Sequence, residues 1–211
     1  MHDLLTELKK HRVLIIFRGQ EPQQCADIAE TLYEAGMRLF EVTLNSADPY
    51  AGITAVRDRV GQDAMVGAGT VLTTDEVDRA AAAGAQFMVS PDVDVDVIEH
   101  TKALGLSSVP GALTPTEVRR AVRAGADVVK IFPIRSVGAD HVRQLRGPLP
   151  DVSYMGTGGV DIALARDCIE AGCTGIGVGV HLLGDPSDPD TLVAGARRLA
   201  EAVGTPLRTT V

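Results

Sequence analysis

The sequence contains no tryptophan, few aromatic residues and only three cysteines. Cys25, Cys168 and Cys173 show no metal-ligand spacing and leave an odd thiol, which excludes a disulfide framework and favours a reduced, cytoplasmic setting. No apolar run approaches the ~20 residues that span a bilayer, and the first residues lack the apolar core and cleavage site of a secretory signal. We therefore expect a soluble protein that is neither exported nor bound to a membrane.

Positive charge is also scarce. Lysine and arginine total 20 against 28 aspartates and glutamates, which gives a net charge of −8 and argues against a nucleic-acid partner. One local cluster, Arg119, Arg120 and Arg123, lies on a predicted helix. A solvated helix face explains this cluster most simply, and anion binding is the alternative.

Motifs for metals and dinucleotides are missing as well. The five histidines are scattered, so no metal centre is predicted. The aspartates between residues 92 and 96 imitate the opening of a calcium loop, but Val97 and Ala103 replace the glycine and glutamate that such a loop needs. The glycines at 67–69 and 175–179 form no G-x-G-x-x-G turn. We therefore predict no cofactor.

Short β-branched runs alternate with amphipathic, alanine-rich stretches along the whole chain. Several of the predicted helices end at a glycine just before the next strand: Gly36, Gly84, Gly105, Gly125 and Gly172. The strand candidates span residues 13–19, 39–45, 65–71, 86–91, 107–112, 127–133, 153–159 and 175–180.

Eight strands joined by helical crossovers predict a parallel sheet, because a parallel neighbour is reached only by crossing the face of the sheet. All eight units are used if the sheet closes into a (β/α)8 TIM barrel, an α/β fold, here as a single domain over residues 1–211. An extra N-terminal helix at about 3–11 and a polar tail after Gly204 would flank the barrel. The alternative is an open, doubly wound sheet.

Strand alternation predicts which residues line the barrel. Glu41 and Thr43 share a face opposite to Phe40 and Val42, as expected where polar residues point inward near the carboxyl end of a strand. The active sites of such barrels lie at that end. The residues expected there are Arg18, Glu41, Thr70, Lys130 and Thr157.

Lys130 interrupts the apolar run Asp-Val-Val-Lys-Ile-Phe-Pro inside a predicted central strand. A lysine removed from water has its ammonium form disfavoured, so a neutral amine becomes available to attack carbonyls. Schiff-base chemistry is one reading, and a lysine that reaches solvent or pairs with Glu41 is the other. A carboxylate such as Glu41 would also serve the proton transfers of imine chemistry.

Two glycine-rich segments follow the last two strands, Gly-Thr-Gly-Gly at 156–159 and Gly-Val-Gly-Val-His at 177–181. Glycines let backbone N–H groups approach an anion, and this region is the usual phosphate site of (β/α)8 barrels. We expect phosphate or carboxylate binding there, with simple tight turns as the alternative.

These segments, with Glu-Val-Thr-Leu-Asn-Ser (41–46), Val-Gly-Ala-Gly-Thr-Val-Leu (66–72) and Lys-Ile-Phe-Pro (130–133), resemble the 2-keto-3-deoxy-6-phosphogluconate aldolase family over residues 12–184. That family includes phosphogalactonate- and 4-hydroxy-2-oxoglutarate-cleaving members. The resemblance implies a class I aldolase, a carbon–carbon lyase of carbohydrate metabolism that releases pyruvate and an aldehyde, and a homotrimer. It implies Lys130 as the Schiff-base lysine and Glu41 as the proton donor and acceptor.

The resemblance also implies how the substrate, a small 2-oxo acid, is held. Thr70 would bind the pyruvyl carboxylate, Phe132 would pack beside the imine, and Thr157 would lie near the aldehyde half. The remaining implied contacts are the backbone positions Gly158, Gly159, Gly179 and Val180, which would face the phosphate.

Two positions depart from the gluconate-type pattern. Asn45 stands where those members carry an arginine, whereas Arg18 matches the arginine of the galactonate-type members. Val180, followed by His181, replaces a common serine, so a hydroxyl donor to phosphate is missing. An unphosphorylated 4-hydroxy-2-oxo acid therefore stays open as the substrate, and His181 is read as a surface residue rather than a ligand.

Two other classes compete with this hypothesis. One is a non-catalytic barrel that binds a sugar phosphate or an organic acid, since a fold alone never establishes activity. The other is an isomerase or decarboxylase that uses carboxylates without an imine. The combination of Lys130 and Glu41 argues against the non-catalytic barrel, and borohydride reduction in the presence of pyruvate would distinguish all three classes, because only an imine-forming enzyme should gain a pyruvyl mass on Lys130.

Overall fold

The computed structural model describes residues 3–205 and 207, so the predicted tail after Gly204 lies mainly outside the described residues. The strands are β1 (Val13–Phe17), β2 (Leu39–Thr43), β3 (Met65–Gly69), β4 (Phe87–Val89), β5 (Ser107–Val109), β6 (Gly111–Ala112), β7 (Val129–Ile131), β8 (Tyr154–Thr157) and β9 (Gly175–Gly179). The α-helices are α1 (Leu4–His11), α2 (Pro22–Glu34), α3 (Pro49–Arg59), α4 (Thr74–Ala82), α5 (Val95–Ala103), α6 (Pro115–Arg123), α7 (Ile134–Val137), α8 (Asp140–Arg146), α9 (Ile162–Glu170) and α10 (Pro189–Ala202). A short 3₁₀ helix, η1 (Val180–Leu182), follows β9.

All strand pairs are parallel, in the order β5-β4-β3-β2-β1-β9-β8-β7-β6. Both edges of this sheet belong to the predicted strand 107–112, which Pro110 divides, since proline has no N–H to donate to a neighbour. The β5 half pairs with β4, and the carbonyl of Pro110 accepts the Lys130 N–H at 2.9 Å on the other side. The sheet therefore closes into the predicted α/β barrel, and the open-sheet alternative is wrong.

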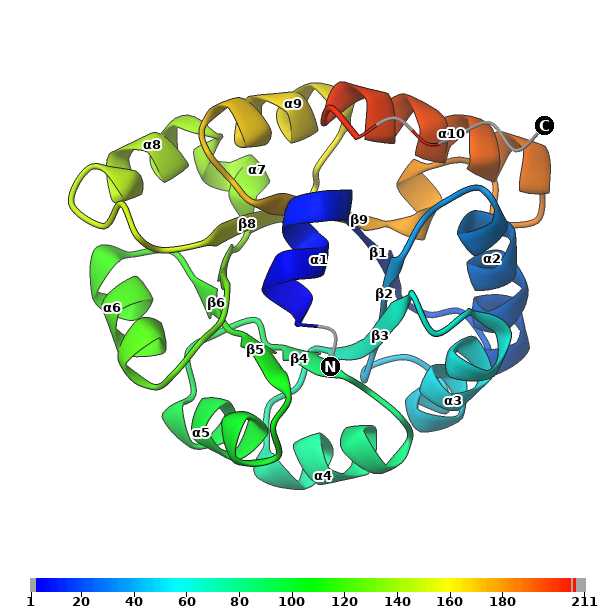
Figure 1. Cartoon of the computed structure of the whole chain (residues 1–211), viewed down its shortest axis with the longest axis horizontal. Coiled ribbons are helices and arrows are strands. Elements are labelled where there is room, and N and C mark those ends of the chain that lie inside the picture. Colours follow the sequence, from blue (N-terminus) through cyan, green and yellow to red (C-terminus); the bar gives the residue numbers. More distant parts are fainter. Residues whose placement is uncertain (1–2, 206, 208–211) are drawn as a thin grey trace.

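The helices surround the strands, and α1 lies across the middle of the ring (Figure 1). The five glycines predicted to end helices all have positive φ, between 73° and 108°, a conformation that costs glycine little. The glycine signal in the sequence therefore located these helix ends correctly.

The predicted N-terminal helix closes the amino end of the barrel. The side chain of Asp3 caps α1 by accepting the Thr6 N–H at 3.2 Å. Leu4 and Leu8 then enter an interior cluster of buried apolar residues, while Phe40 belongs to the layer between strands and helices. Apolar packing thus fills the end of the barrel near α1 and leaves the polar inner residues to the carboxyl ends of the strands.

Candidate active site

Lys130 lies on the inner face of β7, and only 7% of its surface is exposed. Its Nζ lies 4.6 Å from the centre of the Phe132 ring, and no carboxylate oxygen of a described residue lies within 4.0 Å of it. Burial lowers the pKa of Lys130, partly offset by the charge of Glu41. The amine is therefore held in surroundings that favour its neutral, nucleophilic form.

Glu41 lies on the inner face of β2 and is 2% exposed. Burial raises the pKa of its carboxyl, an effect opposed by the positive charges of Lys130 and Arg18. Its Oε2 has no hydrogen-bond partner among the described residues. Glu41 and Lys130 therefore interact through charge without forming an ion pair within 4.0 Å.

Arg18 and Asn45, which follow adjacent strands, are in contact. The guanidinium of Arg18 donates to Asn45 Oδ1 at 2.9 Å. The two strand ends are joined further because Thr43 Oγ1 donates to the carbonyl of Phe17 at 3.1 Å. An arginine at position 45 would therefore reach the same part of the barrel mouth as Arg18.

Thr70 follows β3 with φ +59°, a left-handed conformation that is a real outlier for a β-branched residue. Such strain persists where the surroundings over-determine it and is common at ligand-binding positions. Val71 holds the next peptide by donating to the carbonyl of Val89 at 3.1 Å. The half-buried threonine is thus set in place at the mouth of the barrel.

Thr157 ends β8 with its hydroxyl buried and without a partner among the described residues. Gly158 and Gly159 follow with φ of +92° and +74°, so both need the freedom of glycine. A Cβ on Gly158 would lie 3.0 Å from the Phe132 ring, which places this loop against the wall beside Lys130. The structure therefore brings together the predicted lysine, Phe132 and the first glycine loop.

In the second glycine segment, residues 177–181, neighbouring residues face different sides of the strand. The Val180 side chain is buried in the layer under the helices, so only its backbone can face a ligand. Gly179 lies on the face of β9 whose glycines point inward, and a Cβ there would meet the His181 ring at 2.6 Å. Exposed His181, read from the sequence as a surface residue, thus covers the inner end of β9 at the mouth.

Two neighbours of the site were missed from the sequence. Asp92, after β4, raises the pKa of Lys130 slightly through its charge, although burial dominates. Arg135, in α7, donates from Nε to the carbonyl of Gly159 at 2.7 Å. The sequence shows only an aspartate in an acidic run and an arginine after a proline, so neither residue carried a signal of its place.

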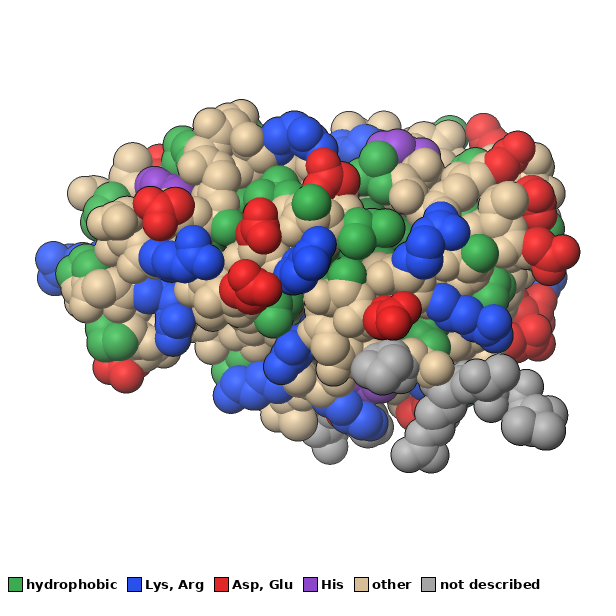
Figure 2. Space-filling model, turned by 90° about the horizontal axis from the view of Figure 1, so that it is seen from above, with side chains coloured by type: hydrophobic (Ala, Val, Ile, Leu, Met, Phe, Trp, Pro, Cys, Tyr) green, Lys and Arg blue, Asp and Glu red, His purple; other side chains and the backbone are tan. Residues whose placement is uncertain are grey.

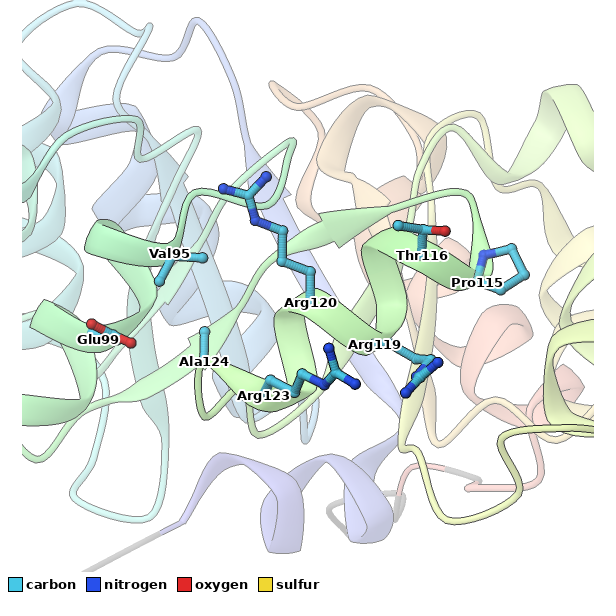
Figure 3. A pocket seen from close by; sticks show the side chains of 8 residues that line it. All are labelled: Val95, Glu99, Pro115, Thr116, Arg119, Arg120, Arg123 and Ala124. Carbon is cyan, nitrogen blue, oxygen red and sulfur yellow. The ribbon is translucent and has the colours of Figure 1, made fainter.

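The cluster formed by Arg119, Arg120 and Arg123 lines an outer groove of about 500 Å³ between α5 and α6, far from the inner faces of the strands. In Figure 3 Arg120 points away from the other two arginines. On the face formed by α8, α9 and α10, Figure 2 shows acidic and basic side chains interspersed. Arg119, Arg120 and Arg123 are all exposed, as predicted for a solvated helix face, and they lie apart from the candidate active site.

Within the described part of the chain, no group of three or more histidine, cysteine, aspartate or glutamate side chains is arranged to hold a metal. The same residues include no helix long and apolar enough to cross a membrane. All three cysteines are buried and free.

Comparison with known proteins shows which family this chain belongs to. The model of "KDPG and KHG aldolase" matches residues 4–190. The 2-dehydro-3-deoxy-6-phosphogalactonate aldolase of Escherichia coli K12 is 35% identical over 171 residues, which cover 81% of this chain and 83% of the relative.

Solved structures agree. A native KDPGal structure superposes with a TM-score of 0.85 at 32% identity, covering 90% of this chain and 93% of the other. A cube-shaped protein cage designed by fusing symmetric oligomeric domains gives a TM-score of 0.86 at 32% identity, covering 92% and 72%. The chain, an α/β-barrel lyase, therefore belongs to the KDPG and KHG aldolase family.

Proposed function

We propose that this chain is a class I aldolase that cleaves a 4-hydroxy-2-oxo acid to pyruvate and an aldehyde, with Lys130 as the Schiff-base lysine. The observation that carries the proposal is a buried primary amine at the open end of the barrel, with no carboxylate oxygen of residues 3–205 within 4.0 Å of it. Burial lowers the pKa of this amine, so its neutral form, the nucleophile towards a ketone, is favoured more than in an exposed lysine. An isomerase or decarboxylase without an imine could use a lysine as an acid, but only an imine mechanism needs it as a neutral nucleophile.

In this mechanism Lys130 Nζ attacks C2 of the oxo acid, and loss of water gives a protonated imine. The C3–C4 bond then breaks while the C4 hydroxyl loses its proton, so the aldehyde departs and the electron pair passes to the imine as an enamine. Protonation at C3 and hydrolysis release pyruvate and restore the amine.

Glu41 is the proposed proton carrier in these steps. Burial raises the pKa of its carboxyl, which makes the protonated form easier to hold than in an exposed glutamate. Its unpartnered Oε2 leaves one oxygen free for the substrate or a water. We expect Glu41 to serve the carbinolamine hydroxyl and C3.

The two ends of the substrate would meet different loops. Thr70 and the adjoining backbone would hold the pyruvyl carboxylate, and Thr157 would lie beside the aldehyde half. Arg18 and the backbone of Gly158 and Gly159 would bind the distal anion. The substrate proposed first is the 2-keto-3-deoxy-6-phosphogalactonate type, supported by Arg18 and by the similar galactonate aldolase.

A second candidate is an unphosphorylated 4-hydroxy-2-oxoglutarate-type substrate. It is suggested by Val180, which replaces a common serine; because the Val180 side chain is buried under the helices, only the backbone of this residue can face an anion. Exposed His181 beside Gly179 would then meet a carboxylate rather than a phosphate.

The test is a panel of 4-hydroxy-2-oxo acids, with and without a 6-phosphate, assayed for pyruvate release. Borohydride reduction with pyruvate should add one pyruvyl mass to Lys130. Lys130→Met should lose both turnover and labelling, whereas Lys10→Met, which removes an exposed lysine of α1, should keep both. Normal turnover of Lys130→Met would refute the mechanism, and a chain that binds these acids without releasing pyruvate would be the non-catalytic barrel.

We also propose that the protein is a cytoplasmic homotrimer of carbohydrate metabolism. Similarity to a chain built from symmetric oligomeric domains supports an oligomer, and three buried free thiols fit a reducing compartment. Light scattering on the purified protein should give three times the chain mass of 22.2 kDa. A monomeric mass would overturn the assembly without touching the chemistry.

A further inference from the structure

Arg135 connects the end of β7 to the loop after β8. Its backbone N–H donates to the carbonyl of Gly158 at 3.2 Å. Its side-chain Nε donates to the carbonyl of Gly159 at 2.7 Å. One residue therefore holds two successive peptide groups of the glycine loop by their oxygen atoms.

The stem of Arg135 also packs on this loop. A Cβ on Gly159 would lie 2.8 Å from Arg135 Nε, 2.9 Å from its Cδ and 3.0 Å from its Cβ. Because Gly159 has φ +74° and no side chain, the arginine stem fills the space above its Cα. The loop is thus confined on the side that faces α7.

Asp161 fixes the other end of the guanidinium. Its Oδ2 accepts from Arg135 Nη2 at 2.7 Å, and its Oδ1 caps α9 by accepting the Leu164 N–H at 2.9 Å. These bonds, the backbone one first, lower the pKa of Asp161 and keep it an anion. The arginine is thereby anchored to the first turn of a barrel helix.

Two N–H groups of the same loop, unlike its carbonyls, are not held by other described residues. Among the described residues, neither Gly159 nor Val160 donates its N–H to an acceptor. With the carbonyls held by Arg135, these donors remain available for an anion from outside the chain.

We infer that Arg135, anchored by Asp161, is a positioning residue that fixes the 157–160 loop so that its backbone N–H groups meet the distal anion of the substrate. The inference rests on the proposed aldolase function. Arg135 acts through the carbonyls of the loop and not by touching the substrate. Since both side chains are more than half exposed, the ion pair itself adds little to stability, and its effect falls on loop geometry.

The experiment compares a 6-phosphorylated 2-oxo acid with its unphosphorylated counterpart in four variants. Arg135→Ala removes both side-chain contacts, and Arg135→Lys keeps the charge but loses the fork that spans Gly159 and Asp161. Asp161→Asn keeps the cap on α9 and weakens the anchor. Arg143→Ala, which removes an exposed arginine paired to Asp140 at 3.8 Å, is the control.

We expect Arg135→Ala to raise KM for the phosphorylated substrate about 10-fold with kcat changed less than about 3-fold, because the distal anion is bound equally in the ground state and the transition state. KM for the unphosphorylated substrate should stay unchanged. Asp161→Asn and Arg135→Lys should raise KM for the phosphorylated substrate by smaller factors. Arg143→Ala should have the kinetic constants of the wild type, and all four variants should have its thermal midpoint.

Equal loss for both substrates, or no loss, would overturn the inference. So would an Arg135→Ala defect beside a normal Asp161→Asn enzyme, because the guanidinium would then act by direct contact. Either result leaves the aldolase proposal intact if the wild-type chain releases pyruvate, and a wild-type chain that releases none defeats the aldolase proposal first.

Discussion

Glu41 occupies the space that a side chain on Gly69 would fill. A Cβ built on Gly69 would lie 1.8 Å from Glu41 Oε1 and 2.5 Å from its Cδ. Both residues point inward from neighbouring strands, β2 and β3. Glu41, the proposed proton carrier, can take this position only because residue 69 has no side chain.

Gly69→Ala should lower kcat by about 100-fold, because the carboxyl of Glu41 must move away from the reacting atoms. Lys130 is untouched, so borohydride trapping of pyruvate should persist. Steady-state kinetics and intact mass measure the two effects. Gly147→Ala, whose new Cβ meets nothing closer than 3.5 Å, is the matched control. Unchanged kcat in Gly69→Ala would show that Glu41 needs no such space.

The pH profile of kcat/KM should report the amine of Lys130. Burial lowers its pKa, an effect opposed by the charge of Glu41 and aided by that of Arg18. The ascending limb of the kcat/KM profile should therefore lie below the ordinary lysine value of 10.5. Arg18→Ala removes one positive charge, which makes the ammonium form easier to keep. The limb should therefore move to higher pH.

Arg143→Ala supplies the control for that profile and should leave the limb in place. A limb that stays fixed in Arg18→Ala would mean that this arginine does not face the amine.

Glu41→Gln should slow turnover by about 10²- to 10⁴-fold, since proton transfer is lost while imine formation remains. It should also change stability. The folded-state pKa of Glu41 is raised, so the folded protein gains stability below the unfolded-state value of about 4.5 and loses it as pH rises through the folded-state pKa.

The glutamine variant lacks this loss. The thermal midpoint of the variant relative to that of the wild type should therefore increase as pH rises from 4 to 8. A constant difference across this range would contradict the raised pKa.

Thr70→Asn should trade function for stability. Asparagine adopts positive φ more easily than a β-branched residue, so relief of the strain should raise the free energy of unfolding by about 1 kcal/mol. Loss of the threonine hydroxyl and its local geometry should raise KM for the 2-oxo acid. Urea unfolding and steady-state kinetics test the two halves, and a variant that is less stable than the wild type would show that the conformation carries no strain.

Much of the barrel could be predicted from local pattern. The glycines after the helices and the alternation around Glu41 and Lys130 each depend on neighbouring residues only, and they located helix ends and inner faces correctly. The division of strand 107–112 at Pro110 was not predicted. It becomes visible only when the pairing of β5 with β4 and of β6 with β7 is known, and the sequence around Pro110 does not show these partners.

The sequence by itself determined the order of strands and helices and which strand residues point inward, because these depend on periods of two and of about 3.6 residues along one chain. Only the tertiary structure decided that Arg135 reaches Gly159, that His181 covers Gly179 and that Gly69 makes room for Glu41. Contacts between side chains and loops of different elements depend on how the closed sheet brings its strand ends together, and no local pattern records that distance.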